Sequence, residues 1–198
     1  MMKKLILASK SIYRKDLLNG LGVPFEVRIP KTNETIENKE KSEELALRLS
    51  IKKAESVILK NQFSEIIIGA DQVASINGEE LKKPSNEDTA IKQLLYCQNK
   101  SVIFFSAVTI IDTETMEYYS TNSLTETKIK KLSEEEISFY VKKNKPYDCS
   151  GGIKIEKNGI ALFEYIKSND PSSILGLPLI WVSKILKKLG MNPLRNNF

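Results

Sequence analysis

An aspartate directly follows a run of apolar and small residues, Ile66 to Ala70, that is typical of a buried β-strand. This spacing predicts that Asp71 lies at the carboxyl end of the strand, where α/β proteins usually bind ligands. A carboxylate there can hold a divalent cation or accept a proton from a water molecule. It can also be a turn-forming residue that accepts backbone hydrogen bonds, so both interpretations stay open.

The segment from Ser9 to Arg14 joins a second apolar run to a predicted helix. The free amides of a helix N-terminus, the hydroxyls of Ser9 and Ser11 and the guanidinium of Arg14 can together face an anion such as phosphate. The segment has no glycine and is therefore not a Walker loop. An ordinary capped helix is the alternative interpretation.

Two lysines and a glutamate are further candidates. Lys53 lies by helical angle on the apolar face of a predicted helix, and Lys83 follows the Asn77-Gly78 turn, where it can lean over the same cleft as Asp71. Glu156 follows the short apolar segment that starts at Ile153. Taken singly, such side chains usually do no more than extend into solvent.

Composition excludes several kinds of catalyst. The chain has 198 residues, a formal net charge of +5, 41% hydrophobic and 28% charged residues, and no histidine. These values are typical of a globular protein with a sizeable core. The missing imidazole excludes Ser-His-Asp and Cys-His catalysis and histidine-ligated zinc. Acid–base chemistry must therefore use carboxylate, lysine, tyrosine or cysteine.

The chain is expected to be cytoplasmic. The apolar run that begins at Leu5 ends at Ala8, which is too short for a secretion signal, and no later run is long enough to span a bilayer. Cys97 and Cys149 are far apart and predict reduced thiols, with no activating partner for a nucleophile. The positive charge is widely spread, which favours a solvated surface over nucleic-acid binding.

The pattern of elements predicts an α/β fold with a mixed sheet. Helices are expected from Ser9 or Ser11 to Gly20, from Ser42 to about Lys60, from Ser85 to Leu95, from Ser133 onward and over Pro178–Leu189. Strands are expected at Leu5–Ala8, Phe25–Ile29, Ile66–Ala70, Ser101–Asp112 and Met116–Lys130, with a polar loop over Pro30–Lys41. Hairpins are expected at Asn77-Gly78 and at Asn158-Gly159, the latter between strands Ile153–Glu156 and Ile160–Ile166.

Several short motifs occur in an order that resembles the Maf family of nucleoside triphosphate pyrophosphatases. They extend over nearly the whole chain and comprise Leu5-Ile6-Leu7-Ala8-Ser9-Lys10-Ser11 with Arg14, Ile68-Gly69-Ala70-Asp71-Gln72, Lys83-Pro84 and Gly176-Leu177-Pro178-Leu179. The resemblance implies one domain over residues 1–198, with a mixed sheet, flanking helices and two lobes around a cleft, similar to inosine-triphosphate pyrophosphatases. It also implies a family that often forms homodimers.

The resemblance implies a reaction and a role for each matching residue. Water attacks the α-phosphorus of a nucleotide and releases pyrophosphate, with a divalent cation (Mg, Mn or Co) as cofactor. Asp71 matches the proton acceptor, Ser9 and Arg14 match the phosphate-binding loop, and Lys53 and Lys83 match two lysines of the family. Glu34 matches a glutamate that we assign, together with Asp71, to metal or water positioning.

Three positions separate the subgroups of this family. Here they hold Tyr13, Gln72 and Glu156, similar to the subgroup acting on 7-methyl-GTP; Arg, Thr and Gln are usual in the dTTP/UTP subgroup. The late segments Gly159–Glu164, Asn169-Asp170-Pro171 and Asn192-Pro193-Leu194 also resemble the 7-methyl-GTP subgroup. An aromatic face and a carboxylate suit the cationic 7-methylguanine ring.

The chain departs from the subgroup pattern at several positions. Tyr13 stands where Trp is common, Lys31 and Asn33 replace acidic residues before Glu34, Lys82 replaces a glycine, and Ser150 an alanine. The changes at Lys82 and Ser150 remove no catalytic group, whereas those at Tyr13, Lys31 and Asn33 bear on base affinity and on the number of bound metal ions. The alternatives are a pyrophosphatase for dTTP/UTP or for many nucleotides, and a nucleotide-binding regulator of septum formation.

Overall fold

The computed structural model describes residues 3–35, 37, 40–59 and 64–195. Their strands form one sheet in the order β2-β1-β3-β5-β6-β7, and β4 pairs with β3. The strands are β1 (Lys4–Ala8), β2 (Glu26–Arg28), β3 (Glu65–Ile76), β4 (Glu79–Leu81), β5 (Ser101–Asp112), β6 (Glu117–Ile129) and β7 (Phe163–Ser168). The α-helices are α1 (Ile12–Asn19), α2 (Ser42–Glu55), α3 (Glu87–Cys97), α4 (Glu134–Asn144) and α5 (Leu179–Lys188).

The sheet is mixed, as the sequence predicts. β1 runs parallel to both β2 and β3, whereas the pairs β3–β5, β5–β6 and β6–β7 are antiparallel. A parallel neighbour requires a crossover connection, and α1 and α2 lie in those connections. The connection from β1 to β2 therefore contains α1, and the connection from β2 to β3 contains α2.

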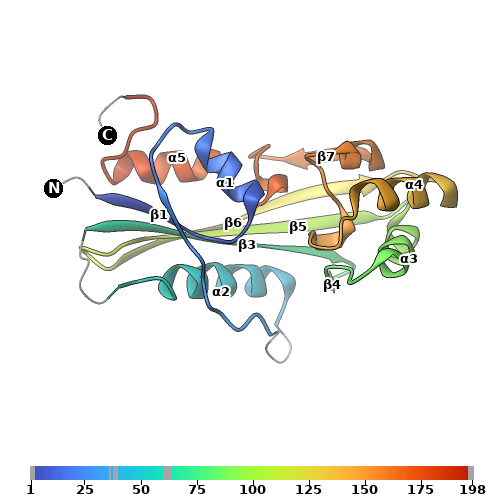
Figure 1. The fold of residues 1–198 in the computed structure, drawn as a ribbon, viewed down its shortest axis with the longest axis horizontal. Helices are drawn as coiled ribbons and strands as arrows, with labels where there is room; N and C mark the ends of the chain where they lie inside the picture. Colours follow the sequence, from blue (N-terminus) through green and yellow to red (C-terminus); the bar gives the residue numbers. More distant parts are fainter. Residues whose placement is uncertain (1–2, 36, 38–39, 60–63, 196–198) are drawn as a thin grey trace.

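The helices cover the sheet in separate groups (Figure 1). α2 lies on one face, and α1 and α5 lie on the other, while α3 and α4 lie toward the opposite end of the long strands. Successive side chains of β1 point to opposite faces of the sheet. Leu5 and Leu7 pack in the cluster that contains Val182 of α5, and Ile6 packs in the cluster that contains Ala54 of α2. A further cluster joins α3 and α4 around Phe104.

One edge of β3 is paired in two separate stretches. β1 pairs with it as far as Ala8 opposite Gly69, and β4 pairs with it from Ala74 opposite Leu81 onward. In the described sheet, residues 70–73 thus have no strand partner on this edge, although they pair with β5 on the other. The chain turns out of the sheet after β1 beside this gap.

Local sequence signals explain most of the element ends. Asn77 and Gly78 have φ values of 52° and 86°, which suits the two-residue hairpin between β3 and β4. Ser11 caps α1 and Asn86 caps α3, each by accepting a backbone N–H. Ser133 begins α4 with the predicted capping box.

Two predicted boundaries are wrong. β3 does not end at Ala70 but continues to Ile76, because its second half is buried and pairs with β5 and β4; Asp71 therefore lies within a strand. α2 ends at Glu55, where the hydroxyl of Ser56 donates to the carbonyl of Lys53. The predicted end at Lys60 lies outside the described residues.

The predicted hairpin at Asn158-Gly159 is also wrong. Residues 153–156 form no strand, and Asn158–Leu162 is a 3₁₀ helix (η2) that precedes β7. The amide of Lys154 donates to the Tyr140 hydroxyl at 2.7 Å, and the Gly159 amide donates to the Lys154 carbonyl at 3.1 Å. Because these bonds occupy the backbone, the segment closes a tight turn instead of pairing as a strand.

Among the described residues, no helix has the length and apolar character needed to cross a membrane. Cys97 and Cys149 are free thiols, as the sequence predicts.

Candidate functional site

A pocket of about 730 Å³ opens beside the unpaired stretch of β3. This volume lies in the range of sites that bind small molecules. The pocket brings together every residue that the sequence nominates: Ser9, Tyr13, Arg14, Glu34, Lys53, Asp71, Gln72, Lys83 and Glu156. Their roles stay predictions, but their convergence from distant parts of the chain agrees with a shared site.

A glycine in β3 allows α2 to approach the pocket floor. A Cβ atom at Gly69 would lie 2.3 Å from the carbonyl oxygen of Ser50 and 2.5 Å from the amide nitrogen of Ala54. Such distances are prohibitive, so only glycine permits this helix–strand contact. The contact places Lys53, which lies between Ser50 and Ala54 on α2, against the next pocket residue of β3, Asp71.

Lys53 joins two carboxylates that come from different segments. Its ammonium lies 2.5 Å from Asp71 Oδ1 and 2.9 Å from Glu34 Oε1. The side chains of Lys53 and Asp71 are only 8% and 12% exposed, against 45% for Glu34. Partial burial acts to raise the pKa of Glu34, but the Lys53 ammonium, with Lys83 and Lys10, outweighs burial and lowers it. The Glu34 carboxylate is thus held in its charged form.

Arg14 enters the pocket from the first turn of α1. The turn before the helix is fixed because Ser9 Oγ accepts from the Ser11 amide at 3.1 Å. Arg14 Nε donates to the Gly176 carbonyl at 2.9 Å. Gly176 has φ +97°, a conformation that other residues rarely adopt. Burial lowers the pKa of Arg14, while the charges of Asp71 and Glu34 oppose this effect.

Gln72 connects three parts of the pocket wall. Its Nε2 lies 2.9 Å from Ser106 Oγ, 3.1 Å from the Ser173 carbonyl and 3.0 Å from the Ile174 carbonyl. The backbone carbonyl of Gln72 accepts a hydrogen bond from Ser150 Oγ at 3.0 Å. The side-chain nitrogen is therefore committed to protein acceptors. This geometry indicates that Gln72 holds the turn preceding Gly176, and its predicted part in base selection stays a prediction.

Tyr13, Cys149 and Glu156 form a group beyond Gln72. Burial raises the pKa of Tyr13, and the neighbouring Glu156 carboxylate raises it further, so the phenol keeps its proton. Burial, with the charges of Asp148 and Glu156, raises the pKa of Cys149 to about 12. The thiol donates to Asp148 at 3.5 Å and is neutral near pH 7, which agrees with the prediction that it is no nucleophile.

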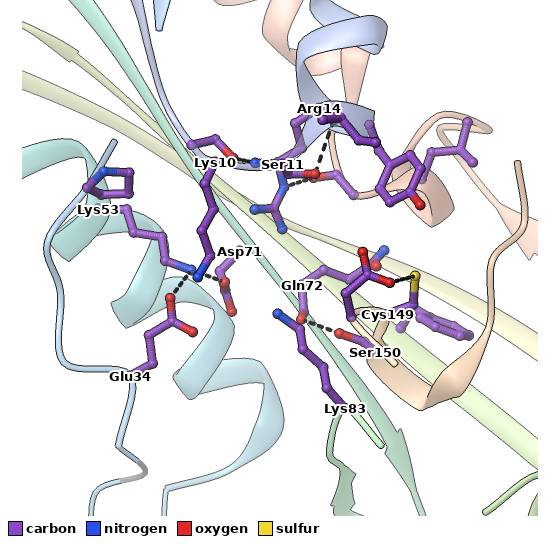
Figure 2. A pocket seen from close by; sticks show the side chains of 18 of the residues that line it. Lys10, Ser11, Arg14, Glu34, Lys53, Asp71, Gln72, Lys83, Cys149 and Ser150 are labelled. Carbon is purple, nitrogen blue, oxygen red and sulfur yellow. Dashed lines mark hydrogen bonds and ion pairs between the residues drawn. The ribbon is translucent and has the colours of Figure 1, made fainter. Parts of the chain in front are cut away.

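The pocket has two chemically different ends. In Figure 2, Lys10, Glu34 and Lys53 lie on one side of Asp71 and Gln72, and Cys149 and Ser150 lie on the other. We call the first side the charged end; it comprises Lys10, Glu34, Lys53 and Asp71, together with Arg14 and Lys83, whose charges interact with that of Glu34. We call the second side the aromatic end; its residues are Tyr13, Cys149 and Glu156, which lie close enough to affect one another's pKa.

Sequence reasoning missed part of the lining. Phe104, Ile155, Ile174 and Leu175 contribute apolar surface from segments that are far apart in the chain. Phe104 lies in β5, Ile155 lies in a turn, and Ile174 and Leu175 lie in a short 3₁₀ helix (Ser173–Leu175), so no single periodicity links them. Lys10 could have been found, since it stands within the predicted anion-binding segment.

Comparison with known proteins shows the family of the chain. Residues 4–189 match the family model described as "Maf-like protein". The chain is 40% identical over 195 residues to the 7-methyl-GTP pyrophosphatase of Albidiferax ferrireducens, covering 97% of this chain and 96% of that protein. It is also 40% identical over 194 residues to the protein of the same name from Bordetella pertussis, covering 96% of this chain and 94% of that protein.

Among solved structures, the Ham1 protein of Staphylococcus aureus is similar at a TM-score of 0.47 and 16% identity, covering 64% of this chain and 72% of that one. The family assignment does not depend on this similarity. It rests on the family match over residues 4–189 and on relatives that are 40% identical over nearly the full length of the chain. The chain belongs to the Maf-like protein family.

Proposed function

We propose that the protein is a nucleoside triphosphate pyrophosphatase that hydrolyses 7-methyl-GTP, or a related modified nucleotide, to the monophosphate and pyrophosphate. The observation that carries the proposal is the position of Asp71, which lies among Arg14, Lys53 and Lys83 at the charged end and next to the aromatic end. A nucleotide laid along the pocket has its phosphates among cations and its base beside Tyr13 and Glu156. The names of the relatives support the same substrate.

In this proposal Asp71 acts as the proton acceptor. Its Oδ1 accepts from Lys53, and its Oδ2 has no hydrogen-bond partner among the described residues. In the proposed step, the oxygen of water bonds to the α-phosphorus while its proton passes to Asp71 Oδ2. The bond between the α-phosphorus and the bridging oxygen breaks, and pyrophosphate leaves with the bonding electrons. Arg14 and Lys83 stabilise the negative charge that develops on the leaving oxygen.

Glu34 and Asp71 fit a divalent cation. Both carboxylates lie against the Lys53 ammonium, and this closeness to one positive charge supports the assignment. The described residues contain no cluster of three or more metal-ligating side chains. A pair of carboxylates suits Mg²⁺, which commonly takes its other ligands from water and substrate phosphates. When bound, such an ion would offset the charge of the phosphates and polarise the α-phosphoryl group.

The aromatic end suits the methylated base. A 7-methylguanine ring is positively charged and offers N–H donors along one edge, so the Glu156 carboxylate can accept from it and Tyr13 can contact its face. Glu156 is exposed at the pocket rim and therefore accessible to the ligand. A single domain over residues 1–198, a cytoplasmic location and a homodimer stay predictions.

The test is pyrophosphate release from 7-methyl-GTP, GTP, dTTP and UTP, each with magnesium, manganese or cobalt, by the wild type and Asp71→Asn. We expect a preference for 7-methyl-GTP and a loss in turnover of about 10²- to 10⁴-fold in the variant, because the amide cannot take a proton. Nucleotide binding and the melting temperature serve as controls for folding.

Each outcome has a defined meaning. Unchanged turnover by Asp71→Asn would exclude this residue as the base. Preference for dTTP or UTP would keep the reaction and contradict the substrate. Binding of 7-methyl-GTP without release of pyrophosphate would favour a nucleotide-binding regulator.

A further inference from the structure

Lys10 lies at the tip of a rigid turn above the pocket. β1 ends at Ala8 and α1 begins at Ile12, and the residues on both sides of Lys10 are fixed by hydrogen bonds. Ser9 Oγ accepts from the Ser11 amide, and Ser11 Oγ accepts from the Arg14 amide at 3.4 Å. The backbone position of Lys10 is therefore set, while its exposed side chain lines the pocket.

The charge of Lys10 is available to a ligand. Arg14 is bonded to the Gly176 carbonyl, and Lys53 is held between Asp71 and Glu34. By contrast, Lys10 makes no ion pair within the part of the chain that the structure describes. A compact ammonium on a flexible stem is well suited to following a phosphate group.

The side chain points toward the charged end. In Figure 2 it extends from the turn toward Glu34 and Lys53, on the side of Asp71 that lies away from Cys149. Its charge also reaches Glu34, where burial acts to raise the pKa and the lysines, Lys10 among them, lower it. Lys10 thus lies on the far side of Asp71 from the aromatic end.

We propose that Lys10 binds the β- and γ-phosphates of the nucleotide, which are the part released as pyrophosphate. The proposal rests on the proposed function, because that function puts the base at the aromatic end and the α-phosphorus at Asp71. The terminal phosphates of such a nucleotide extend past Asp71 toward Lys10. Lys10 is then a ligand-binding residue for the leaving group and not for the nucleoside monophosphate.

The experiment compares Lys10→Met with Lys15→Met. Lys15 is an exposed lysine of α1 that does not line the pocket. Lys15→Met therefore removes the same charge as Lys10→Met, but at a position outside the pocket. Titration calorimetry measures the binding of inorganic pyrophosphate and of 7-methyl-GMP to each protein. We expect Lys10→Met to bind pyrophosphate about tenfold more weakly, as for the loss of one charge-assisted contact. Binding of 7-methyl-GMP should change less than about twofold, and Lys15→Met should match the wild type.

Three results would overturn the proposal. They are unchanged pyrophosphate binding in Lys10→Met, equal weakening of both ligands, and a loss in Lys15→Met as large as that in Lys10→Met. The readout is separate from the proposed function, since binding is measured without turnover. A wild type that binds pyrophosphate through Lys10 but hydrolyses no nucleotide would contradict the function and not the role of Lys10.

Discussion

The charged end and the aromatic end of the pocket are built in different ways. Asp71 and Lys53 come from the interior of β3 and from α2, which are packed together across Gly69. Cys149 and Glu156 come from the segment between α4 and β7, which has no strand or α-helix. Asp71 and Lys53 of the charged end are therefore placed by the sheet and its helix, whereas Cys149 and Glu156 of the aromatic end depend on individual side-chain bonds.

Those bonds hold the aromatic end at two points. Ser150 Oγ donates to the Gln72 carbonyl, and the Lys154 amide donates to the Tyr140 hydroxyl. The first bond attaches the segment to β3 and the second attaches it to α4. Under the proposed function, regular elements thus fix the reacting groups and an irregular segment shapes the site for the base. Loops on a rigid scaffold commonly carry specificity in this way.

The largest expected effect comes from removing the Lys53 ammonium, which lies between the carboxylates of Glu34 and Asp71. In Lys53→Met, the nearly buried Asp71 carboxylate loses its partner, and breaking a buried ion pair costs about 3 to 5 kcal/mol. We expect the free energy of unfolding in urea to fall by about 3 kcal/mol. Turnover should fall as well, because Lys53 holds Asp71 in position.

Lys52→Met is the matched control. Lys52 is the residue before Lys53 on α2, and its side chain is 45% exposed. It pairs with Glu37, which is 62% exposed, so the expected loss in the free energy of unfolding is below about 1 kcal/mol. Equal losses in the two variants would show that the charged end is no more rigidly built than the surface, and would remove the basis of the comparison.

A smaller effect is expected at the aromatic end. Glu156→Gln keeps the shape of the side chain but removes the charge that is proposed to face the methylated base. We expect kcat/KM for 7-methyl-GTP to fall about tenfold and that for UTP to change less than about twofold. The control is Glu164→Gln, whose exposed side chain pairs with Lys128 outside the pocket. Equal losses on both nucleotides would contradict base recognition by Glu156.

The sequence predicted the charged end better than the aromatic end, for a physical reason. Asp71 and Lys53 lie in periodic segments, so the pattern of apolar residues showed which element carries each of them. The pattern could not show that β3 continues past Asp71, since a buried run gives no sign of where its partners end. It also could not show that Lys53 is held by two carboxylates, because the Glu34 loop has no periodicity.

At the aromatic end, the wrong hairpin at Asn158-Gly159 has a specific cause. The dipeptide is a strong signal for a hairpin turn, but neither Asn158 nor Gly159 has the positive φ that this turn needs. The segment is held instead by the Tyr140 hydroxyl and by the Lys154 carbonyl. Tyr140 belongs to α4, and no local rule links a helix residue to that segment. Glu156 was assigned to the pocket by family resemblance, since its residue type alone indicated a surface carboxylate.

The smallest expected effect is the pH-dependent stability that the Glu34 ion pair gives to the charged end. The pKa of Glu34 is lowered from its ordinary value of 4.5, with Lys53 outweighing burial, so its ion pair stabilises the folded state above about pH 4.5. That contribution should disappear as the pH falls through the folded-state pKa. Because the side chain is 45% exposed, we expect less than about 1 kcal/mol.

The measurement is the melting temperature of the wild type and Glu34→Gln between pH 3 and pH 9. The difference between them should be constant from about pH 5 upward and should shrink below that, because only the wild type loses an ion pair on acidification. Cys149 and Tyr13 should add no titration in this range, since the pKa of Cys149 is about 12 and that of Tyr13 is also raised. A difference that grows as the pH falls would mean that Glu34 is held in its neutral form, and the charged end would then lack the second carboxylate on which its proposed cation site depends.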